Sequence, residues 1–136
     1  MKEKILVIED DRQALNLMEY ILRHEGYEVL SARDGLEGVK RARTETPDLI
    51  ILDVMLPGLD GYEVCQLLRE KAETSGLPIL MISGKVHRDD REIGLGVGAS
   101  DYLEKPVSPS TIVARVETLL ADGNEVPAPG TGSGDV

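Results

Sequence analysis

Five short apolar runs alternate with longer amphipathic segments along this chain of 136 residues. The runs are 5–8, 27–30, 49–52, 79–82 and 102–103. Because their side chains are apolar on both faces, they are typical of strands buried in a parallel sheet. Strands that alternate with helices pack as a sheet with helices on both faces. The pattern therefore predicts an α/β fold, a doubly wound five-stranded parallel sheet covered by helices on both faces.

The intervening segments repeat apolar residues at helical spacing. In the segment after Asp34, the side chains of Leu36, Val39 and Ala42 are predicted to share one buried face. Segment 89–97 predicts a weaker helix, because its two glycines lower the helix propensity. Ser108 stands where an N-cap belongs, and Pro109 stands at the first position of the last helix.

Composition excludes several classes of function. A formal net charge of −10 disfavours contact with nucleic acid or with an anionic membrane surface. No apolar stretch approaches the ~20 residues that a membrane span needs, and Ile5 already belongs to a strand-like run, without a signal peptide before it. Cys65 is the only cysteine, which excludes an intramolecular disulfide. A cytoplasmic protein is expected.

Charged and polar residues follow four of the predicted strands. They are Glu9, Asp10 and Asp11 after the first strand, Asp53 after the third, Ser83 and Gly84 after the fourth, and Lys105 and Pro106 after the fifth. In folds of this class, ligands bind beyond the carboxyl ends of the strands at a topological switch point. We therefore expect these side chains to converge on one rim of the sheet.

This set of groups suits phosphoryl chemistry. Crowded carboxylates stay ionised only where a cation compensates them, and Mg²⁺ prefers one or two carboxylates with water and phosphate oxygens. Lys105 adds a point charge able to meet a phosphate, and the Ser83 hydroxyl can donate a hydrogen bond to a phosphoryl oxygen. Metal, ammonium and hydroxyl together stabilise a phosphoryl group in transfer.

Each residue also has a simpler explanation when it is taken alone. Asp11, or less readily Asp10, could cap the first helix, and Asp53 could begin a loop. Lys105 could be an ordinary surface residue. These separate explanations do not account for the presence of such residues after four different strands. Their shared position favours a functional site.

The sequence resembles the receiver domains of two-component response regulators over residues 2 to 121. The segments 53–61 (DVMLPGLDG) and 98–106 (GASDYLEKP) match two blocks of that family. The family's site positions are present as Glu9-Asp10, Asp53, Ser83 and Lys105-Pro106. The resemblance implies a flavodoxin-like receiver topology. It implies a receiver domain over residues 1–121, with 122–136 as a flexible tail or the start of a linker to an absent effector.

The resemblance also implies a role for each matching residue. Asp53 would receive a phosphoryl group from the phosphohistidine of a sensor histidine kinase or a histidine phosphotransfer protein. The implied ligands of Mg²⁺, with Mn²⁺ as a substitute, are Asp10 and Asp53 directly, the main-chain carbonyl of Met55, and Glu9 through water. Lys105 would contact the phosphoryl oxygens, and its peptide bond to Pro106 would be cis.

The implied function is a phosphorylation switch and not an enzyme, since its chemistry is limited to self-directed phosphotransfer and autodephosphorylation. Ser83 would swing toward the phosphoryl group and Tyr102 would rotate inward behind it. The fourth helix, fifth strand and fifth helix would then control an output or partner, with a phosphorylation-dependent homodimer as one form of that output. Ser83 for Thr and Val107 for Phe depart from the commoner family pattern, but neither removes a required group.

Three alternatives make different demands on the sequence. A phosphohydrolase that forms an aspartyl phosphate would have a second acid two residues after its nucleophile, where Met55 stands. A nucleotide- or flavin-binding module would have a glycine- or hydroxyl-rich loop after the first strand, where the acidic residues stand. A degenerate receiver used only for docking would lack Asp53, Lys105 or the acidic pair.

Overall fold

The structure is a computed structural model that describes residues 2–84 and 90–122. Its five strands form one sheet in the order β2-β1-β3-β4-β5, and every neighbouring pair is parallel. The strands are β1 (Lys4–Ile8), β2 (Glu28–Ala32), β3 (Leu49–Asp53), β4 (Ile79–Ser83) and β5 (Asp101–Glu104). This order is the flavodoxin-like one. The predicted fold class is confirmed.

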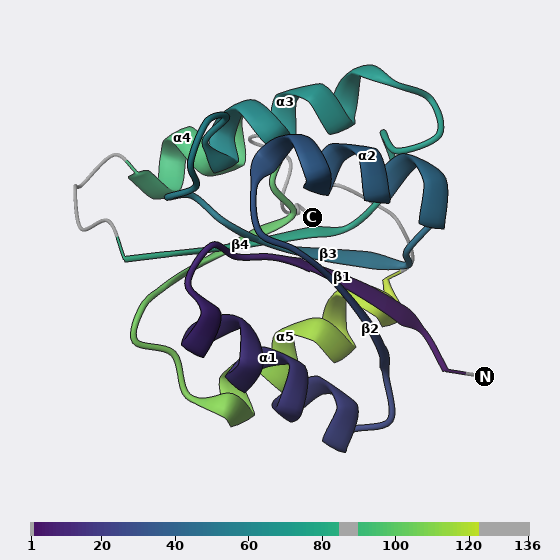
Figure 1. Cartoon of the computed structure of the whole chain (residues 1–136), viewed down its shortest axis with the longest axis vertical. Coiled ribbons are helices and arrows are strands. Elements are labelled where there is room, and N and C mark those ends of the chain that lie inside the picture. Colours follow the sequence, from purple (N-terminus) through teal and green to yellow (C-terminus); the bar gives the residue numbers. More distant parts are fainter. Residues whose placement is uncertain (1, 85–89, 123–136) are drawn as a thin grey trace, which may run out of the picture.

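Helices cover both faces of the sheet (Figure 1). One face carries α1 (Arg12–His24) and α5 (Pro109–Ala121). The other carries α2 (Gly35–Glu45), α3 (Gly61–Glu70) and α4 (Asp90–Gly96). Since both faces are buried, the central strands need apolar side chains at every position, which explains their unbroken apolar sequence.

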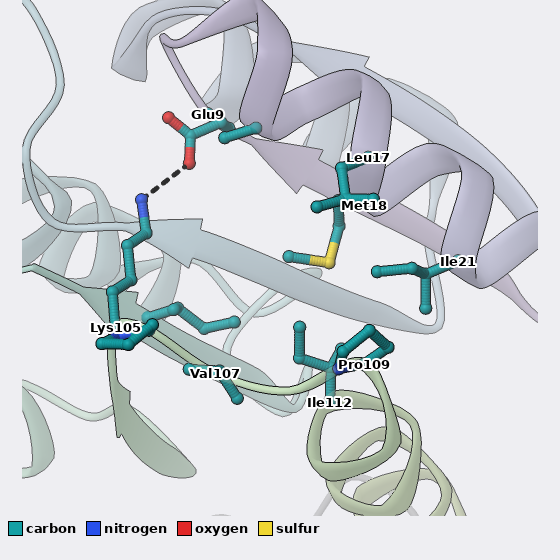
Figure 2. Close-up of a pocket in the computed structure, with 11 residues that line it drawn as sticks. Glu9, Leu17, Met18, Ile21, Lys105, Val107, Pro109 and Ile112 are labelled. Atoms are coloured by element: carbon teal, nitrogen blue, oxygen red, sulfur yellow. Dashed lines mark hydrogen bonds and ion pairs between the residues drawn. The ribbon is translucent and has the colours of Figure 1, made fainter.

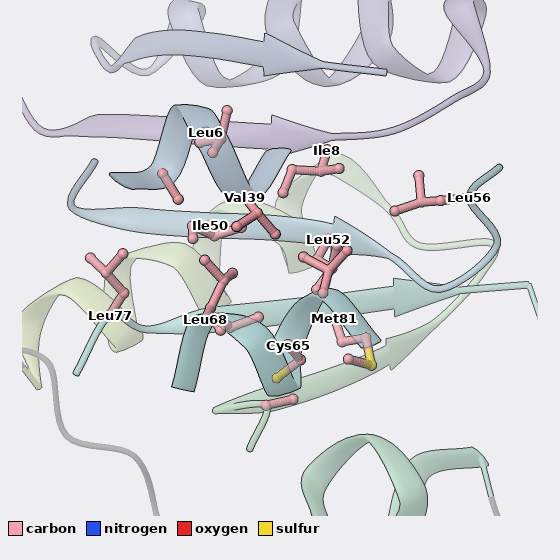
Figure 3. Packing of buried hydrophobic residues seen from close by; sticks show 14 of the residues in the cluster. Leu6, Ile8, Val39, Ile50, Leu52, Leu56, Cys65, Leu68, Leu77 and Met81 are labelled. Atoms are coloured by element: carbon pink, nitrogen blue, oxygen red, sulfur yellow. The ribbon is translucent and has the colours of Figure 1, made fainter. Parts of the chain in front are cut away.

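Successive strand residues divide between two hydrophobic clusters, one on each face. Leu6, Ile8 and Ile50 pack with α2 and α3, as Figure 3 shows. Ile5 and Val7, from the same first strand, pack with α1 and α5. The alternation follows from the two-residue period of a strand. It fixes the register of β1 and β3, because a slip of one residue would exchange the two faces.

Side-chain caps set where the helices begin. Asp11 caps α1 by accepting a hydrogen bond from Ala14 N, and Ser108 caps α5 with Pro109 in the first turn. The assignment of Asp11 as a cap separates it from Asp10, which does not serve α1 in this way. The predicted start of the last helix is confirmed.

The predicted inward face of α2 is wrong at Leu36, whose side chain is 71% exposed. Val39 and Ala42 are buried as predicted, and Gly35 and Gly38 occupy the other buried positions of this helix. A Cβ on Gly38 would lie 2.5 Å from Ile8 Cδ1, and one on Gly35 would lie 2.7 Å from Leu59 O. Gly38 therefore lets the helix lie close to β1, and Gly35 lets its first turn lie close to Leu59, while Leu36 faces solvent.

Small differences at the element ends matter for the site. β3 and β4 each run one residue further than predicted, so Asp53 and Ser83 are the last residues of their strands. Helix α4 ends at Gly96, one residue before the predicted end, and residue 89, where it was predicted to begin, lies outside the described residues. Of the predicted tail 122–136, only Asp122 is described, as the C-cap of α5.

Within the described ranges, no helix has the length and apolarity to cross a membrane.

We expect Gly61→Ala to destabilise the fold. A Cβ at Gly61 would lie 2.5 Å from Asp53 O and 2.6 Å from Val54 Cα, both main-chain atoms that cannot move aside alone. Such overpacking costs about 1–3 kcal/mol of unfolding free energy. Urea denaturation checks this, with Gly96→Ala as the matched control, because a Cβ at Gly96 meets no atom within 4 Å. Equal stability of the two variants would contradict the prediction.

Candidate functional site

The carboxyl ends of four strands bring the predicted site residues to one rim of the sheet. Asp53 ends β3 and Ser83 ends β4, while Glu9 and Lys105 directly follow β1 and β5. Main-chain hydrogen bonds extend the sheet to the last two, since Glu9 N donates to Ala32 O (3.0 Å) and Lys105 N donates to Ser83 O (2.8 Å). The sheet itself therefore fixes where these side chains start.

The Lys105 ammonium bridges two carboxylates. Its Nζ lies 3.2 Å from Glu9 Oε1 and 3.3 Å from Asp53 Oδ2. The side chains of Glu9 and Asp53 are only 10% and 8% exposed. Figure 2 shows the Lys105 side chain reaching Glu9 across the rim. Three of the predicted residues thus form one connected group.

Burial and charge shift the pKa values of Glu9 and Lys105. Desolvation by burial raises the pKa of Glu9, and the Asp53 charge raises it further, against the opposing effects of the Asp11 N–H and Lys105. Burial lowers the pKa of Lys105, but the charges of Asp53 and Glu9 outweigh it and leave that pKa raised. One ammonium between two ionised carboxylates leaves one negative charge uncompensated, so the site favours a further cation.

The Asp53 carboxylate is oriented from two sides. Met55 N donates a hydrogen bond to its Oδ1 at 3.1 Å, while Oδ2 faces Lys105. Met55 is 60% exposed, and it therefore contacts the site through its main chain and not through its side chain. The loop between β3 and α3, which contains Met55, is held by the hydrogen bond from Gly61 N to Val54 O (2.8 Å).

The predicted metal ligands fit a magnesium ion by their chemistry. Buried Glu9 and Asp53 and exposed Asp10 supply hard carboxylate oxygens, which Mg²⁺ combines with water and phosphate oxygens. In the part of the chain that the structure describes, no three His, Cys, Asp or Glu side chains are gathered closely enough to hold a metal ion as they stand. The ligand set of Glu9, Asp10, Asp53 and Met55 stays a prediction.

Tyr102 and Ser83, the two predicted switch residues, are both fully buried. The Tyr102 ring lies against α4, where a Cβ on Gly94 would come within 2.8 Å of its Cδ2 atom. The structure thus shows the inward orientation of Tyr102, and its predicted rotation stays a prediction. The peptide bond between Lys105 and Pro106 is cis, as predicted.

Two features of the site were not predicted from the sequence. Arg33, which follows β2, donates hydrogen bonds from Nη2 (3.1 Å) and Nε (3.4 Å) to Asp10 O at the rim. An apolar groove of about 490 Å³ also opens beside Glu9 and Lys105 (Figure 2). Between α1 and α5 its lining includes Leu17, Met18, Ile21, Val107, Pro109 and Ile112. The 57% exposure of Leu17 shows that the apolar stripe of α1 is wider than its contact with the sheet.

Comparison with known proteins gives a consistent result. The sequence model of the family described as "Response regulator receiver domain" matches residues 5–117. The alkaline phosphatase synthesis transcriptional regulatory protein PhoP of Bacillus subtilis is 47% identical over 129 residues, which cover 95% of this chain and 52% of that protein. The chain therefore spans about half the length of this curated relative.

Solved structures agree with this fold. The response regulator receiver domain protein (CheY-like) of Methanospirillum hungatei is 28% identical with a TM-score of 0.84, over 90% of this chain and 96% of that one. The receiver domain of the sensor histidine kinase PA1611 of Pseudomonas aeruginosa is 30% identical with a TM-score of 0.83, over 89% and 99%. In that neighbour a magnesium ion is coordinated in the active site cleft.

We expect the raised pKa of Glu9 to appear in the pH dependence of stability. A carboxyl whose folded pKa is raised stabilises the fold below its ordinary value of 4.5, and this contribution is lost as pH rises through the folded value. With a metal chelator present, Glu9→Gln should therefore become more stable relative to wild type as the pH rises through the folded pKa of Glu9. Chemical denaturation at a series of pH values measures the difference.

Glu70→Gln is the matched control, because Glu70 is an exposed glutamate at the C-terminal end of α3 and is not one of the site residues. Its pH profile should run parallel to that of wild type. If the Glu9→Gln profile also ran parallel to wild type, the ionised Glu9 carboxylate would not carry the burial cost assigned to it.

Proposed function

The chain belongs to the response regulator receiver domain family, and from this we propose that Asp53 accepts a phosphoryl group from a phosphohistidine donor. The donor would be a sensor histidine kinase or a histidine phosphotransfer protein. The observation that carries the proposal is the group formed by Lys105 Nζ between the buried carboxylates of Glu9 and Asp53. It combines a nucleophilic carboxylate, a phosphate-binding ammonium and an unmet demand for positive charge.

The proposed transfer uses groups that already face one another. An oxygen of Asp53 would attack phosphorus, and the phosphorus–nitrogen bond of phosphohistidine would break, leaving its electron pair on the imidazole. Lys105, 3.3 Å from Asp53 Oδ2, would bind the equatorial oxygens that gather charge in the transition state. A Mg²⁺ ion, or Mn²⁺ in its place, would supply charge neutralisation through Glu9, Asp10, Asp53 and the Met55 carbonyl. Chemistry would be limited to this self-directed transfer and to autodephosphorylation.

The proposed response begins with charge. A phosphoryl group adds about two negative charges beside Ser83 and Lys105, so a conformer able to donate hydrogen bonds to it gains population. The readout would be the surface of α4, β5 and α5. Arg91 of α4 joins these elements, since its Nη1 donates to Tyr102 O (2.7 Å) and its Nη2 lies 3.9 Å from Asp101 Oδ1. Arg115 of α5 binds the same Asp101 carboxylate at 2.5 Å.

The wider setting is also a proposal. We take residues 1–121 as the receiver domain and 122–136 as a flexible tail or the start of a linker. The output would be a partner protein, an effector or a phosphorylation-dependent homodimer. The net charge of −10 would repel nucleic acid and anionic membranes, so we propose that this chain contacts neither directly. The charge also suits a cytoplasmic protein.

The groove beside Lys105 is the proposed approach of the phosphoryl donor. It is apolar, lies between two helices and opens at Glu9 and Lys105, so a helix seated on it could present a phosphohistidine to Asp53. Leu17 lies on its exposed edge, which makes it available to a partner.

We expect one phosphoryl group to be added to the wild-type chain by acetyl phosphate with Mg²⁺, and none without a divalent ion. Asp53→Asn should abolish the addition. Intact-mass measurement checks this, with Asp48→Asn as the matched control because Asp48 directly precedes the opposite end of β3. A phosphoryl group that persists on Asp53→Asn would overturn the assignment of the acceptor.

We expect Leu17→Glu to slow transfer from any histidine kinase that phosphorylates the wild-type chain, roughly 10-fold or more if Leu17 is an interface hot spot. A charge in the apolar groove would oppose docking, whereas acetyl phosphate is too small to need the groove. Leu36→Glu is the matched control, since Leu36 is 71% exposed on α2 and does not line the groove. Equal loss with both phosphodonors would argue against a docking role.

A further inference from the structure

The peptide group between Asp10 and Asp11 is held from both sides by charged side chains. Its carbonyl oxygen, Asp10 O, accepts hydrogen bonds from Arg33 Nη2 at 3.1 Å and from Nε at 3.4 Å. Its N–H, on Asp11, donates to Glu9 Oε2 at 2.9 Å. A guanidinium and a buried carboxylate are thus joined through one peptide unit.

This arrangement strengthens both hydrogen bonds. A cation at the carbonyl draws electron density toward oxygen and makes the N–H of the same peptide a better donor. The acceptor of that N–H is an ionised carboxylate, and charge-assisted hydrogen bonds are the stronger kind. The orientation of the Glu9 carboxylate therefore depends partly on Arg33, although the two side chains need not touch.

The sheet places Arg33 for this role. Arg33 follows Ala32, the last residue of β2, which pairs with Ile8 of β1. Ala32 O also accepts the hydrogen bond from Glu9 N, and the Arg33 N–H donates to Glu37 Oε1 at 3.3 Å. The main chain of Arg33 is thus fixed relative to the acidic loop before its side chain reaches over that loop.

The two oxygens of Glu9 then have separate tasks. Oε2 accepts from the Asp11 N–H, while Oε1 faces the Lys105 ammonium at 3.2 Å. With both oxygens engaged, the plane of the carboxylate is set. Without Arg33, the peptide between Asp10 and Asp11 would lose one of its two restraints. The carboxylate of Glu9, which accepts a hydrogen bond from this peptide, and Asp10, which supplies its carbonyl, would then be held less firmly.

We propose that Arg33 is a positioning residue of the acidic site, which acts through the peptide between Asp10 and Asp11 to hold Glu9 and Asp10 ready for a divalent cation. The inference rests on the proposed function, in which these two residues help to bind Mg²⁺. Arg33 itself would touch neither the metal nor the phosphoryl group. Residues that orient metal ligands in this indirect way typically change metal affinity when they are replaced.

The test compares Mg²⁺ affinity, by titration calorimetry on the full chain, for wild type, Arg33→Ala and Arg33→Lys. Arg33→Ala should weaken binding roughly 3- to 10-fold, the lower part of the range for such residues because Arg33 is exposed. Arg33→Lys keeps the charge and one donor and should recover part of the loss. Urea denaturation of each variant confirms that it is folded.

Arg41→Ala is the matched control. Arg41 also donates from a guanidinium to a main-chain carbonyl of β2, Ser31 O at 3.2 Å, but it does not reach the acidic loop. The Arg41→Ala substitution removes the same charge as Arg33→Ala but no contact with the acidic loop. The Mg²⁺ affinity of this variant should therefore stay near that of wild type. A second readout is the Asp11 amide proton in nitrogen-15 NMR without metal, which should move upfield in Arg33→Ala and stay in place in Arg41→Ala.

The outcomes separate this inference from the function on which it rests. Failure of wild type to bind Mg²⁺ would count against the proposed metal site. Binding by wild type with unchanged affinity in Arg33→Ala would remove the role of Arg33 alone. Tighter binding in Arg33→Ala would also overturn it, since the guanidinium would then act only by repelling the dication.

Discussion

The structure depends on one electrostatic imbalance, two buried carboxylates that share a single ammonium. Lys105 lies within 3.3 Å of both Glu9 and Asp53, yet one positive charge cannot neutralise two negative ones. The deficit is costly because neither carboxylate is well solvated. A site in this condition gains when a cation enters. The proposed phosphoryl group would add further negative charge, so its transfer to Asp53 would make a bound cation and the Lys105 ammonium more necessary.

The fold makes this imbalance tolerable by fixing its members with main-chain hydrogen bonds. Asp53 and Ser83 end strands that are buried on both faces, and Glu9 and Lys105 are tied to neighbouring strands by their own N–H groups. The apolar strands could be predicted from the sequence because a doubly covered parallel sheet requires them. The meeting of the polar residues could be predicted too, because parallel strands end at the same edge of a sheet.

Other features could not be predicted, since they depend on the distance between elements and not on the pattern within one element. Leu36 has the spacing of a buried helical residue, but α2 lies close to Ile8 at Gly38 and close to Leu59 at Gly35, and Leu36 is left exposed. Arg33 carries no motif, and its contact with Asp10 O exists only because β2 lies beside β1. The groove between α1 and α5 arises in the same way, from apolar side chains of two helices that no further element in residues 2–84 and 90–122 covers.

The proposed path from the site to the surface of α4, β5 and α5 would run through the packing of Tyr102. Its ring fills the space that Gly94 leaves on α4, and its carbonyl oxygen accepts a hydrogen bond from Arg91 Nη1. Packing against α4 therefore holds the ring in its inward orientation. Because Arg91 also approaches Asp101, which binds Arg115, a shift of Tyr102 would be felt by α4, β5 and α5 together.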